Sequence, residues 1–416
     1  MKLLIIGGGI GGLVTALSLN QAGIEVEIFE QTQELRELGV GINLLPHAVK
    51  ELAALGLMPA LDGAGVRTRE LIYLNRLGQM VWRELRGIDA GYEVPQLSIH
   101  RGKLHGVLLQ AVLARLGATH LHTDRRLVDF DERQGCVIAI FESRTGERSE
   151  AQGDGVIGAD GIHSRLRSIF YPEEGPPRWS GIMLWRGTLP WPVYADGRTM
   201  VIAGGNAAKF VFYPIHYDPK QPDIRLTNWA VMARTGDDGE RPPRREDWNS
   251  VGQLEDARAF VADSFRLGFV EPAQMIEATG TFYEYPNCDR DPVARWSFGR
   301  ATLLGDAAHP MYPVGSNGAS QAILDAAALA RHLRATRDVA EAFAAYDGER
   351  RPLTADIVRN NRRGGPEGVI DLVEARAPDG FDDIEAVASF AEREAIVRGY
   401  ASMAGYAQEQ VNRGGG

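Results

Sequence analysis

The stretch Leu3–Leu13, LLIIGGGIGGL, decides the fold of this chain. It opens with Leu3–Ile6, a short apolar run with the length of a buried parallel strand. Gly7, Gly9 and Gly12 then follow with the spacing G-x-G-x-x-G. The first of these glycines allows a tight turn, the second lets a pyrophosphate approach the backbone, and the third lets a helix pack closely on the strand. The stretch therefore predicts a strand, a turn and a helix that bind a dinucleotide.

The residues that follow complete a strand–helix–strand unit. Ile10–Asn20 is typical of an apolar helix, and its N-terminal N–H groups and dipole would face the phosphates. Ile24–Phe29 is typical of a second strand, and Glu30 ends it. Glu30 lies 30 − 12 = 18 residues past Gly12, where a carboxylate can accept hydrogen bonds from ribose hydroxyls. Together these features indicate a Rossmann-type α/β domain.

Two later stretches also combine an apolar strand with an acid and a turn of small residues. In the first, Asp160 with Gly161 either orients ribose or ribityl hydroxyls or fixes the loop. In the second, Gly305-Asp306 is followed by the glycine-rich turn Gly315–Gly318 and an apolar helix. The free N–H donors at the start of that helix could hold the negative charge of a reduced flavin ring.

Several arginines and glycines between these stretches are compatible either with cofactor binding or with an ordinary surface position. Arg36 either reaches a phosphate or ribose of the dinucleotide or belongs to a surface loop. Gly39 and Gly41 would let the backbone lie close to a flat ring system. Arg101, where a strand meets a helix, either pairs with a phosphate through its planar fork or is a surface arginine.

A different pattern interrupts the α/β order in the middle of the chain. Strand-like runs rich in β-branched and aromatic residues predict an antiparallel sheet inserted between two halves of the dinucleotide domain. The predicted domains are 1–175 with 288–360 for the dinucleotide, 176–287 for the substrate sheet, and 361–416 as a C-terminal helical segment. A helix from Val339 to Arg350 is expected to end before Pro352. The predicted runs of the inserted sheet are Ile182–Trp185, Thr199–Ala203, Phe210–His216 and Leu226–Met232.

Composition excludes several classes of protein. The chain has 416 residues, 44% of them hydrophobic, which is enough for a large core or for two domains. The net charge of −10 and the lack of a basic run argue against a nucleic-acid partner or a membrane surface. No stretch reaches the length of a membrane span, and the N-terminus is too interrupted by glycine for a secretion signal. Cys136 and Cys288 lie far apart without metal-ligand spacing, which predicts no metal site and a reduced cytoplasm.

The order of these motifs resembles that of the class A flavoprotein monooxygenases, over most of the chain up to about residue 360. The shared motifs are Gly7–Gly12 with Glu30, Asp160-Gly161 and Gly305-Asp306. The resemblance implies a Rossmann-type FAD-binding domain, a substrate domain like that of para-hydroxybenzoate hydroxylase, and C-terminal helices. Shorter pieces are similar to the branch that holds salicylate-hydroxylase-type and 5-methylphenazine-1-carboxylate 1-monooxygenase-type enzymes. These pieces are LGVGIN (38–43), SIHRG (98–102), GADGIHS (158–164), MLWRG (183–187) and YPVGSNGASQAILDA (312–326).

This resemblance implies a non-covalent FAD, with NADH or NADPH and O2 as co-substrates. Reduced flavin would add oxygen at C4a, and the resulting hydroperoxide would hydroxylate an electron-rich phenazine-like or other (hetero)aromatic carboxylate or phenol. In the family, Asp306 holds the ribityl chain, Asp160 serves both FAD and nicotinamide, and backbone around Pro313–Gly318 lines the isoalloxazine. The cofactor-binding residues expected here are Gly7, Gly9, Gly11, Gly12, Glu30, Arg36, Gly41, Arg101, Asp160, Gly305, Asp306, Pro313, Gly315, Asn317 and Gly318.

The hydroxylation requires a dry cavity against one face of the flavin. Tyr213 and His216 are candidates to deprotonate a phenolic substrate, but the pattern assigns no general base. Arg186 or Lys209 could pair with a substrate carboxylate. The residues expected to wall the pocket are Trp185, Phe212, Tyr213 and Tyr285.

Two other classes of function remain open at this level. A flavin oxidase or dehydrogenase of the same fold would take electrons from the substrate itself. The glycine turns by themselves would also be compatible with a protein that binds a nucleotide but catalyses no reaction. The expected partner is a small aromatic substrate, and the expected oligomeric state is a monomer or a homodimer.

Overall fold

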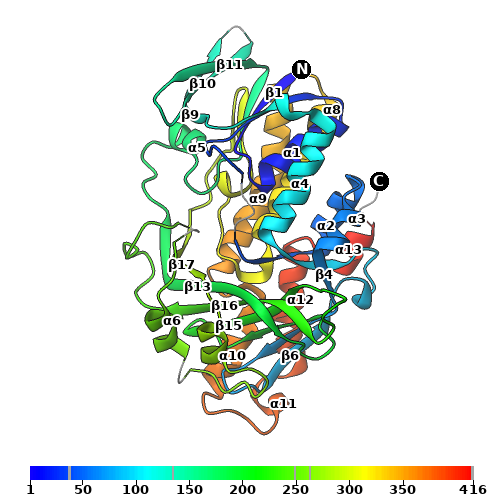
Figure 1. Cartoon of the computed structure of the whole chain (residues 1–416), viewed down its shortest axis with the longest axis vertical. Coiled ribbons are helices and arrows are strands. Elements are labelled where there is room, and N and C mark those ends of the chain that lie inside the picture. The colour runs from blue at the N-terminus through cyan, green and yellow to red at the C-terminus, as the bar shows by residue number, and fades with distance from the viewer. Residues whose placement is uncertain (36–38, 134, 248–249, 262–263, 414–416) are drawn as a thin grey trace.

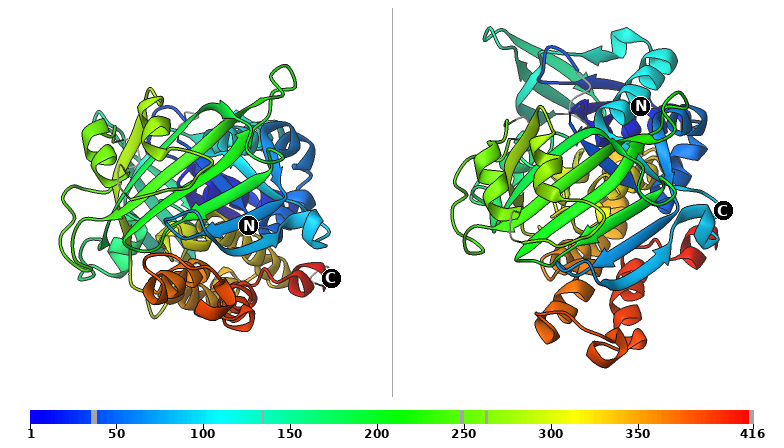
Figure 2. Two further views of the ribbon diagram at one scale, coloured as in Figure 1. Left: turned by 90° about the horizontal axis from the view of Figure 1, so that it is seen from below. Right: turned by 60° about the horizontal axis from the view of Figure 1, so that its bottom comes forward.

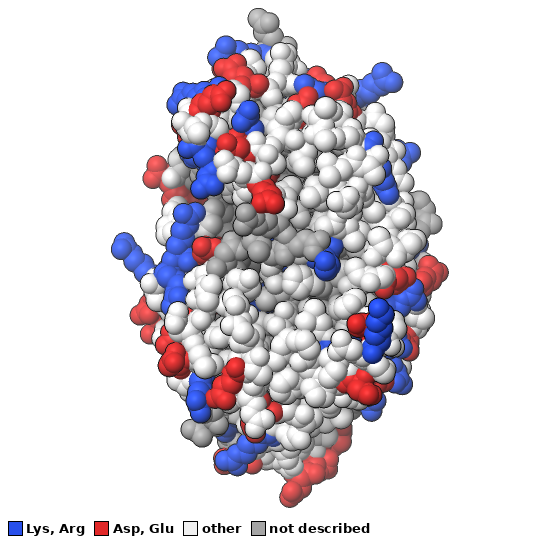
Figure 3. Space-filling view, viewed as in Figure 1, with Lys and Arg blue, Asp and Glu red and all other residues white. Residues whose placement is uncertain are grey.

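The computed structural model describes residues 1–35, 39–133, 135–247, 250–261 and 264–413. The strands of these residues form four sheets, of which the two largest lie in the upper and lower halves of Figure 1. The C-terminal segment, orange to red, runs from the lower end up to the right side, where the C-terminus lies. Acidic and basic side chains are interspersed over the face that Figure 3 shows. None of the described helices has the length and apolar character needed to cross a membrane.

The upper sheet is the predicted dinucleotide fold. Its described strands run in the order β18-β19-β12-β1-β2-β8, and every pair except β18–β19 is parallel. Since β1 is apolar on both faces, its residues Leu3 to Ile6 are at most 3% exposed. The strands are β1 (Lys2–Ile6), β2 (Glu25–Phe29), β8 (Leu121–His122), β12 (Gly155–Gly158), β18 (Ser297–Phe298) and β19 (Ala301–Leu303).

Helices and a small meander cover this sheet. Helix α1 packs against both α4 and α8, and Phe141 of the meander stacks on Phe29 with ring centroids 4.3 Å apart. These contacts join the upper half into one core. The covering elements are α1 (Ile10–Gln21), α4 (Arg101–Leu116), α5 (Arg165–Phe170), α8 (Gly318–Ala335), α9 (Val339–Asn361), and the strands β9 (Arg126–Arg133), β10 (Cys136–Glu142) and β11 (Arg148–Gly153).

The lower sheet confirms the predicted inserted sheet and extends it. Its described strands run in the order β17-β13-β16-β15-β14-β5-β6. β5 and β6 come from the range 1–175, and β5 joins the sheet through a parallel pairing with β14. The two predicted domains therefore share this sheet. Its strands are β5 (Glu70–Leu74), β6 (Met80–Leu85), β13 (Arg178–Pro192), β14 (Thr199–Ala203), β15 (Ala208–His216), β16 (Ile224–Arg234) and β17 (Phe282–Asp289).

The two faces of the lower sheet belong to different cores. One face, with Trp185 and Phe212, packs on α6 (Leu254–Val261) and α7 (Pro272–Glu277). The other face, with Tyr213, packs on C-terminal helices. Figure 2 shows these helices and the yellow-green α6 and α7 on opposite sides of the green strands. The C-terminal helices are α10 (Gly368–Arg376), α11 (Ile384–Val387), α12 (Phe390–Met403) and α13 (Gln408–Arg413).

A third sheet lies between the two halves. Its order is β3-β7-β4, and Gly41 of β3 pairs with His100, the residue before α4. It therefore places Gly41 and the start of α4 at the junction of the two large sheets. The remaining described elements here are β3 (Gly41–Leu44), β4 (Gly65–Thr68), β7 (Gln96–His100), α2 (Pro46–Ala54) and α3 (Met58–Ala64).

The predicted end of the helix before Pro352 is wrong. Helix α9 continues through Pro352 to Asn361. Pro352 itself is exposed, so its ring displaces no core atom. Arg350 and Thr354 on either side are buried, and Arg350 Nε donates to Asp325 Oδ1 at 2.8 Å. This packing outweighs the cost of about 3 kcal/mol that a proline imposes on a helix interior.

Pro352→Ala should therefore stabilise the protein, because alanine restores the missing N–H donor without removing a core contact. We expect the free energy of unfolding to rise by about 1–3 kcal/mol, measured by urea unfolding. Pro59→Ala is the matched control: Pro59 is also exposed but sits in the first turn of α3, where no N–H is needed. An equal gain in both variants would contradict the explanation.

Candidate functional site

The motif residues converge at one edge of the upper sheet. β2, β1, β12 and β19 are parallel neighbours, so their carboxyl ends lie side by side. Glu30, Gly7, Asp160 and Gly305 follow these ends closely in the chain. The loops are joined by backbone bonds between neighbouring strands, such as Ala159 N to Ile6 O at 2.8 Å and Leu304 N to Gly158 O at 2.9 Å. The carboxyl edge of such a sheet is where α/β proteins bind nucleotides.

The glycine turn has the close packing that its spacing predicts. Gly7 has φ of 109°, a conformation that favours glycine. A Cβ at Gly12 would overlap the carbonyl oxygen of Gly7, so the helix can approach the strand only without a side chain there. A Cβ at Gly9 would meet nothing within 4 Å. Gly11 packs near Leu304 instead. The turn therefore leaves open space at Gly9, the position where a pyrophosphate approaches.

Glu30 holds the same turn through its carboxylate. It is 8% exposed and accepts hydrogen bonds from Gly8 N at 2.7 Å and Thr32 N at 2.8 Å. His105 Nε2 lies 2.7 Å from the carbonyl oxygen of Gly8 on the other side. His105 could not be recognised from the sequence alone, because its contact crosses from α4 to a turn far away in the chain.

Asp160 has one bound oxygen and one free oxygen. Its Oδ2 accepts hydrogen bonds from Arg165 N at 2.7 Å and Leu166 N at 3.5 Å, which fixes the loop at the start of α5. Its Oδ1 is buried and has no hydrogen-bond partner among the described residues. Burial raises the pKa of Asp160, and the bonds to α5 oppose this shift. The free oxygen is available to a ligand.

Asp306 follows β19 at the carboxyl edge of the upper sheet. The residue is exposed and accepts no hydrogen bond from the part of the chain that the structure describes. The surrounding protein nevertheless raises the pKa of Asp306 through desolvation. Burial lowers the pKa of Arg101, whereas the charge of Asp306 opposes that shift. An acidic group and a guanidinium from distant segments thus act on each other here.

A buried ion cluster supports the turn at Gly305. Gly305 N donates to Asp325 Oδ2 at 3.1 Å, and that carboxylate also contacts His309 Nε2 at 2.5 Å. Arg350 Nε lies 2.8 Å from its other oxygen. Although burial alone would raise it, His309 and Arg350 hold the pKa of Asp325 below its usual range. An acid inside an otherwise apolar helix was the signal in the sequence that could have revealed this cluster.

The loop 312–318 is held by the C-terminal segment. Gly315 has φ of 66°, and a Cβ there would come within 2.8 Å of the Tyr400 ring. Asn317 Nδ2 donates to Tyr400 Oη at 2.9 Å, and Tyr400 Oη donates to Asn361 Oδ1 at 2.6 Å. Pro313 is exposed, and Gly318 begins α8. Helix α12 therefore fixes the loop 312–318, which the family resemblance leads us to expect beside the isoalloxazine.

Arg186 joins the lower sheet to β3. It donates to Gly41 O at 2.5 Å and to Tyr285 Oη at 3.0 Å. Gly41 N in turn donates to Asn228 Oδ1 at 2.7 Å. Burial raises the pKa of Tyr213 to about 12 although Arg186 opposes the shift. This shift disfavours the phenolate form of Tyr213 at neutral pH.

The expected aromatic wall divides between the two faces of the sheet. Tyr213 and Tyr285 lie near Arg186 on the side of the junction. Trp185 and Phe212 lie in the opposite core, where Trp185 stacks on Phe260 at 5.3 Å. His216 is exposed at the end of β15. Arg36 lies outside the described residues.

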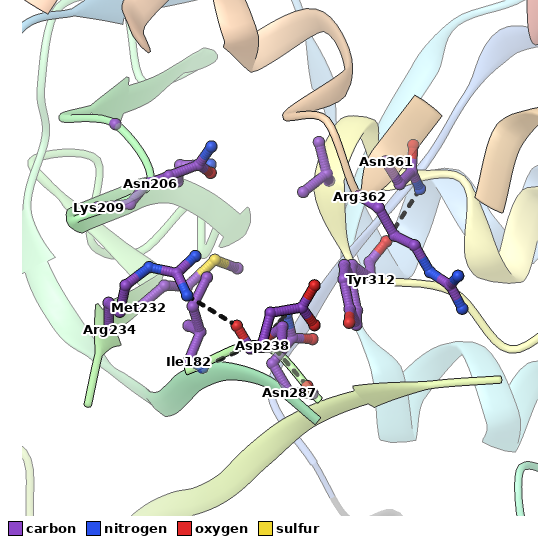
Figure 4. A pocket seen from close by; sticks show the side chains of 13 residues that line it. Ile182, Asn206, Lys209, Met232, Arg234, Asp238, Asn287, Tyr312, Asn361 and Arg362 are labelled. Atoms are coloured by element: carbon purple, nitrogen blue, oxygen red, sulfur yellow. Dashed lines mark hydrogen bonds between the residues drawn. The ribbon is translucent and has the colours of Figure 1, made fainter. Parts of the chain in front are cut away.

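A cavity opens between the lower sheet and the loop 312–318 (Figure 4). Ile182, Lys209 and Met232 line it from the sheet, and Tyr312 and Val314 line it from the loop. The Tyr312 hydroxyl is buried and has no hydrogen-bond partner among the described residues. Polar and charged side chains also line the cavity, among them Arg234, Asp238 and Arg362, so its walls combine apolar groups with charges of both signs and an unsatisfied hydroxyl.

Comparison with known proteins shows the family. Residues 1–253 and 283–361 match the FAD binding domain family. The chain is 42% identical over 364 residues to phenazine 1,6-dicarboxylic acid hydroxylase PhzS of Lysobacter antibioticus, covering 86% of this chain and 89% of the relative. It is 30% identical over 399 residues to 3-hydroxybenzoate 6-hydroxylase of Polaromonas naphthalenivorans, covering 92% and 94%.

Solved structures share the fold. HpxO of Klebsiella pneumoniae, solved with FAD and uric acid, has a TM-score of 0.73 at 23% identity and covers 97% of this chain and 96% of its own. CtdE, solved with FAD and a substrate, has a TM-score of 0.75 at 19% identity and covers 97% and 98%.

The fold and site define an FAD-dependent monooxygenase that hydroxylates an aromatic substrate with NAD(P)H and O2. The chain belongs to the FAD-binding family of class A flavoprotein monooxygenases, as its motifs predict. The residues fit that cofactor: Gly9 leaves open space, and Asp160 Oδ1 and the Asp306 carboxylate lack protein partners among the described residues. When bound, FAD supplies the redox and oxygen chemistry, and the protein supplies binding and orientation.

Asp306→Ala should lose FAD without unfolding the protein, because it removes a ligand group and no core volume. Hydrogen bonds to a charged group contribute about 1.5–3 kcal/mol, so the dissociation constant should rise about tenfold or more. Flavin retention on dialysis and circular dichroism measure the two effects. Asp356→Ala, at an exposed acid on α9, is the control and should retain FAD. Equal retention by both variants would refute the assignment.

Acid should destabilise the folded protein through His47. Burial, aided by the charge of Arg350, lowers the pKa of His47 to about 3. The folded pKa lies below the unfolded value of 6.5, so unfolding takes up a proton between these values. The stabilisation is complete above pH 6.5 and is lost as the pH falls, by up to about 1.4 kcal/mol per pH unit. Urea unfolding from pH 7 to 4.5 should show a smaller slope for His47→Gln, whereas the exposed His216→Gln should keep the parent slope.

Proposed function

We propose that this enzyme hydroxylates a phenazine-like heteroaromatic carboxylate in the cavity between the lower sheet and the loop 312–318. The proposal is supported by one cavity that holds Lys209 and the Tyr312 hydroxyl, which has no partner among the described residues, together with the apolar side chains of Ile182, Met232 and Val314. A carboxylate needs a cation close by, and a ring needs an apolar surface. The relative at 42% identity is named for a phenazine dicarboxylic acid, which fits this combination.

The motif residues have the following proposed roles toward FAD. Gly7–Gly12 and Glu30 hold the ADP part, with Arg101 near a phosphate and Asp306 on the ribityl hydroxyls. Asp160 accepts a hydrogen bond from the cofactor through Oδ1, which has no partner among the described residues. The backbone from Pro313 to Gly318 and at Gly41 lies against the ring. Arg36 keeps its predicted role toward a phosphate or ribose.

The residues at the junction act by positioning. Arg186 is held between a backbone oxygen and two tyrosines, so its guanidinium has a fixed place beside the flavin site. Tyr213 and Tyr285 keep water from that place because their rings are buried. The raised pKa of Tyr213 disfavours its phenolate, so we propose that a phenolic substrate loses its proton to another group or to water. We propose further that the enzyme works in the cytoplasm as a monomer or homodimer, which agrees with two unpaired cysteines, Cys136 and Cys288.

The proposal is tested with the purified, FAD-loaded protein. Phenazine-1-carboxylate should accelerate NADH or NADPH oxidation with O2 uptake, and 3-hydroxybenzoate should act less well. The methyl ester of phenazine-1-carboxylate is the matched control, and it should stimulate at least tenfold less because it lacks the charge that Lys209 recognises. Product mass distinguishes a simple gain of one oxygen from hydroxylation with loss of CO2. Equal stimulation by the acid and its ester would refute the proposed substrate class. A lack of stimulation by either phenazine would refute it as well.

A further inference from the structure

Lys209 is a buried cation in the wall of the cavity. It lies on β15, on the same face as Tyr213, and is only 3% exposed. Its Nζ contacts Glu367 Oε2, and Glu367 is only 4% exposed. Figure 4 shows Lys209 on the strand that faces Tyr312 and Arg362 across the cavity. Burying both charges is costly, so the pair is weak evidence for a role in stability alone.

The other oxygen of Glu367 contacts the loop 312–318, which we call the flavin loop. Glu367 Oε1 accepts a hydrogen bond from Gly315 N at 3.1 Å. One carboxylate therefore touches the cation of the cavity and the backbone of the loop 312–318. The loop is conformationally strained at Ser316, which has φ of 57° although it is not a glycine. A strained loop depends on such contacts for its position.

Two other cations line the cavity, Arg234 and Arg362, and each is engaged by a group outside the loop 312–318. Arg362 is engaged by Asp289 at 2.7 Å and by Asp291 at 2.6 Å. Arg234 donates to a backbone oxygen of Ser180 at 3.0 Å.

A second acid, Asp371, also acts on Lys209. Burial raises the pKa of Asp371, and Lys209 opposes the shift. Its Oδ1 accepts from Asn206 N at 2.7 Å, so this acid is tied to the sheet and not to the flavin loop.

We propose that Lys209 and Glu367 form a relay that reports occupancy of the cavity to the flavin loop. The proposal rests on the proposed function, because the signal is the carboxylate of the substrate. Lysine has three donors, so an entering carboxylate shares Nζ with Glu367. Glu367 is then less neutralised and binds Gly315 N–H more strongly, which moves the loop against the flavin. Lys209 and Glu367 are thus positioning residues for flavin reduction.

The test is anaerobic flavin reduction by NADH in FAD-loaded enzyme, with and without saturating phenazine-1-carboxylate. Glu367→Gln keeps an acceptor oxygen but removes the charge. It should bind the probe as tightly as the parent or tighter, because Lys209 is no longer shared, yet its stimulation ratio should fall at least fivefold. A residue that only stabilised the fold would weaken binding and stimulation together. The probe's dissociation constant is read from equilibrium dialysis.

Two further variants control for folding. Lys209→Met/Glu367→Gln removes both charges of the pair, so neither is left without its partner, and it should lose both probe affinity and stimulation while keeping FAD. Arg83→Met/Glu70→Gln removes another pair with a buried carboxylate on the same sheet, and its stimulation ratio should be unchanged.

The outcomes separate the relay from the proposed function. A Glu367→Gln enzyme with the parent stimulation ratio overturns the relay alone. Probe that binds the parent enzyme without changing its flavin reduction also overturns the relay alone. Absence of probe binding to the parent overturns the proposed substrate class, and the relay with it.

Discussion

The structure depends on the contact between Gly7 and Gly12, where helix α1 meets the end of β1 with no side chain between them. That approach sets the position of α1, which packs on both α4 and α8. These helices in turn carry Arg101 and the network around Asp325 to the carboxyl edge of the sheet. The positions of the groups proposed to hold FAD therefore depend on one backbone-to-backbone contact. The rest of the molecule is built outward from that edge.

The C-terminal helices hold the loop 312–318, which we propose to lie against the flavin. Tyr400 bonds Asn317 and Asn361, and Glu367 bonds Gly315, so segments beyond residue 360 fix the loop before α8. The same segments cover one face of the lower sheet. A single set of helices thus positions the loop and closes the sheet, and the two halves cannot shift independently without breaking these bonds.

Local chemistry explains which features could be predicted from the sequence. The glycine spacing, the strand-end acids and the β-branched runs have local causes, and they predicted the fold class and the convergence of Gly7, Asp160 and Asp306. The division of Trp185 from Tyr213 could not be predicted in the same way. Alternation places neighbouring residues on opposite faces, but only the covering helices decide which face meets the flavin domain. His105 and Glu367 act through contacts between distant segments, for which a single sequence carries no local signal.

The parallel pairing of β5 with β14 has a consequence for synthesis on the ribosome. Glu70 pairs with Thr199, so β5 leaves the exit tunnel 199 − 70 = 129 residues before its partner. Every residue of β5 is buried in the finished protein. Until β14 emerges, β5 has an open edge of the kind that chaperones shield from aggregation. During synthesis, β5 therefore cannot complete its pairing in the lower sheet until β14 has been made.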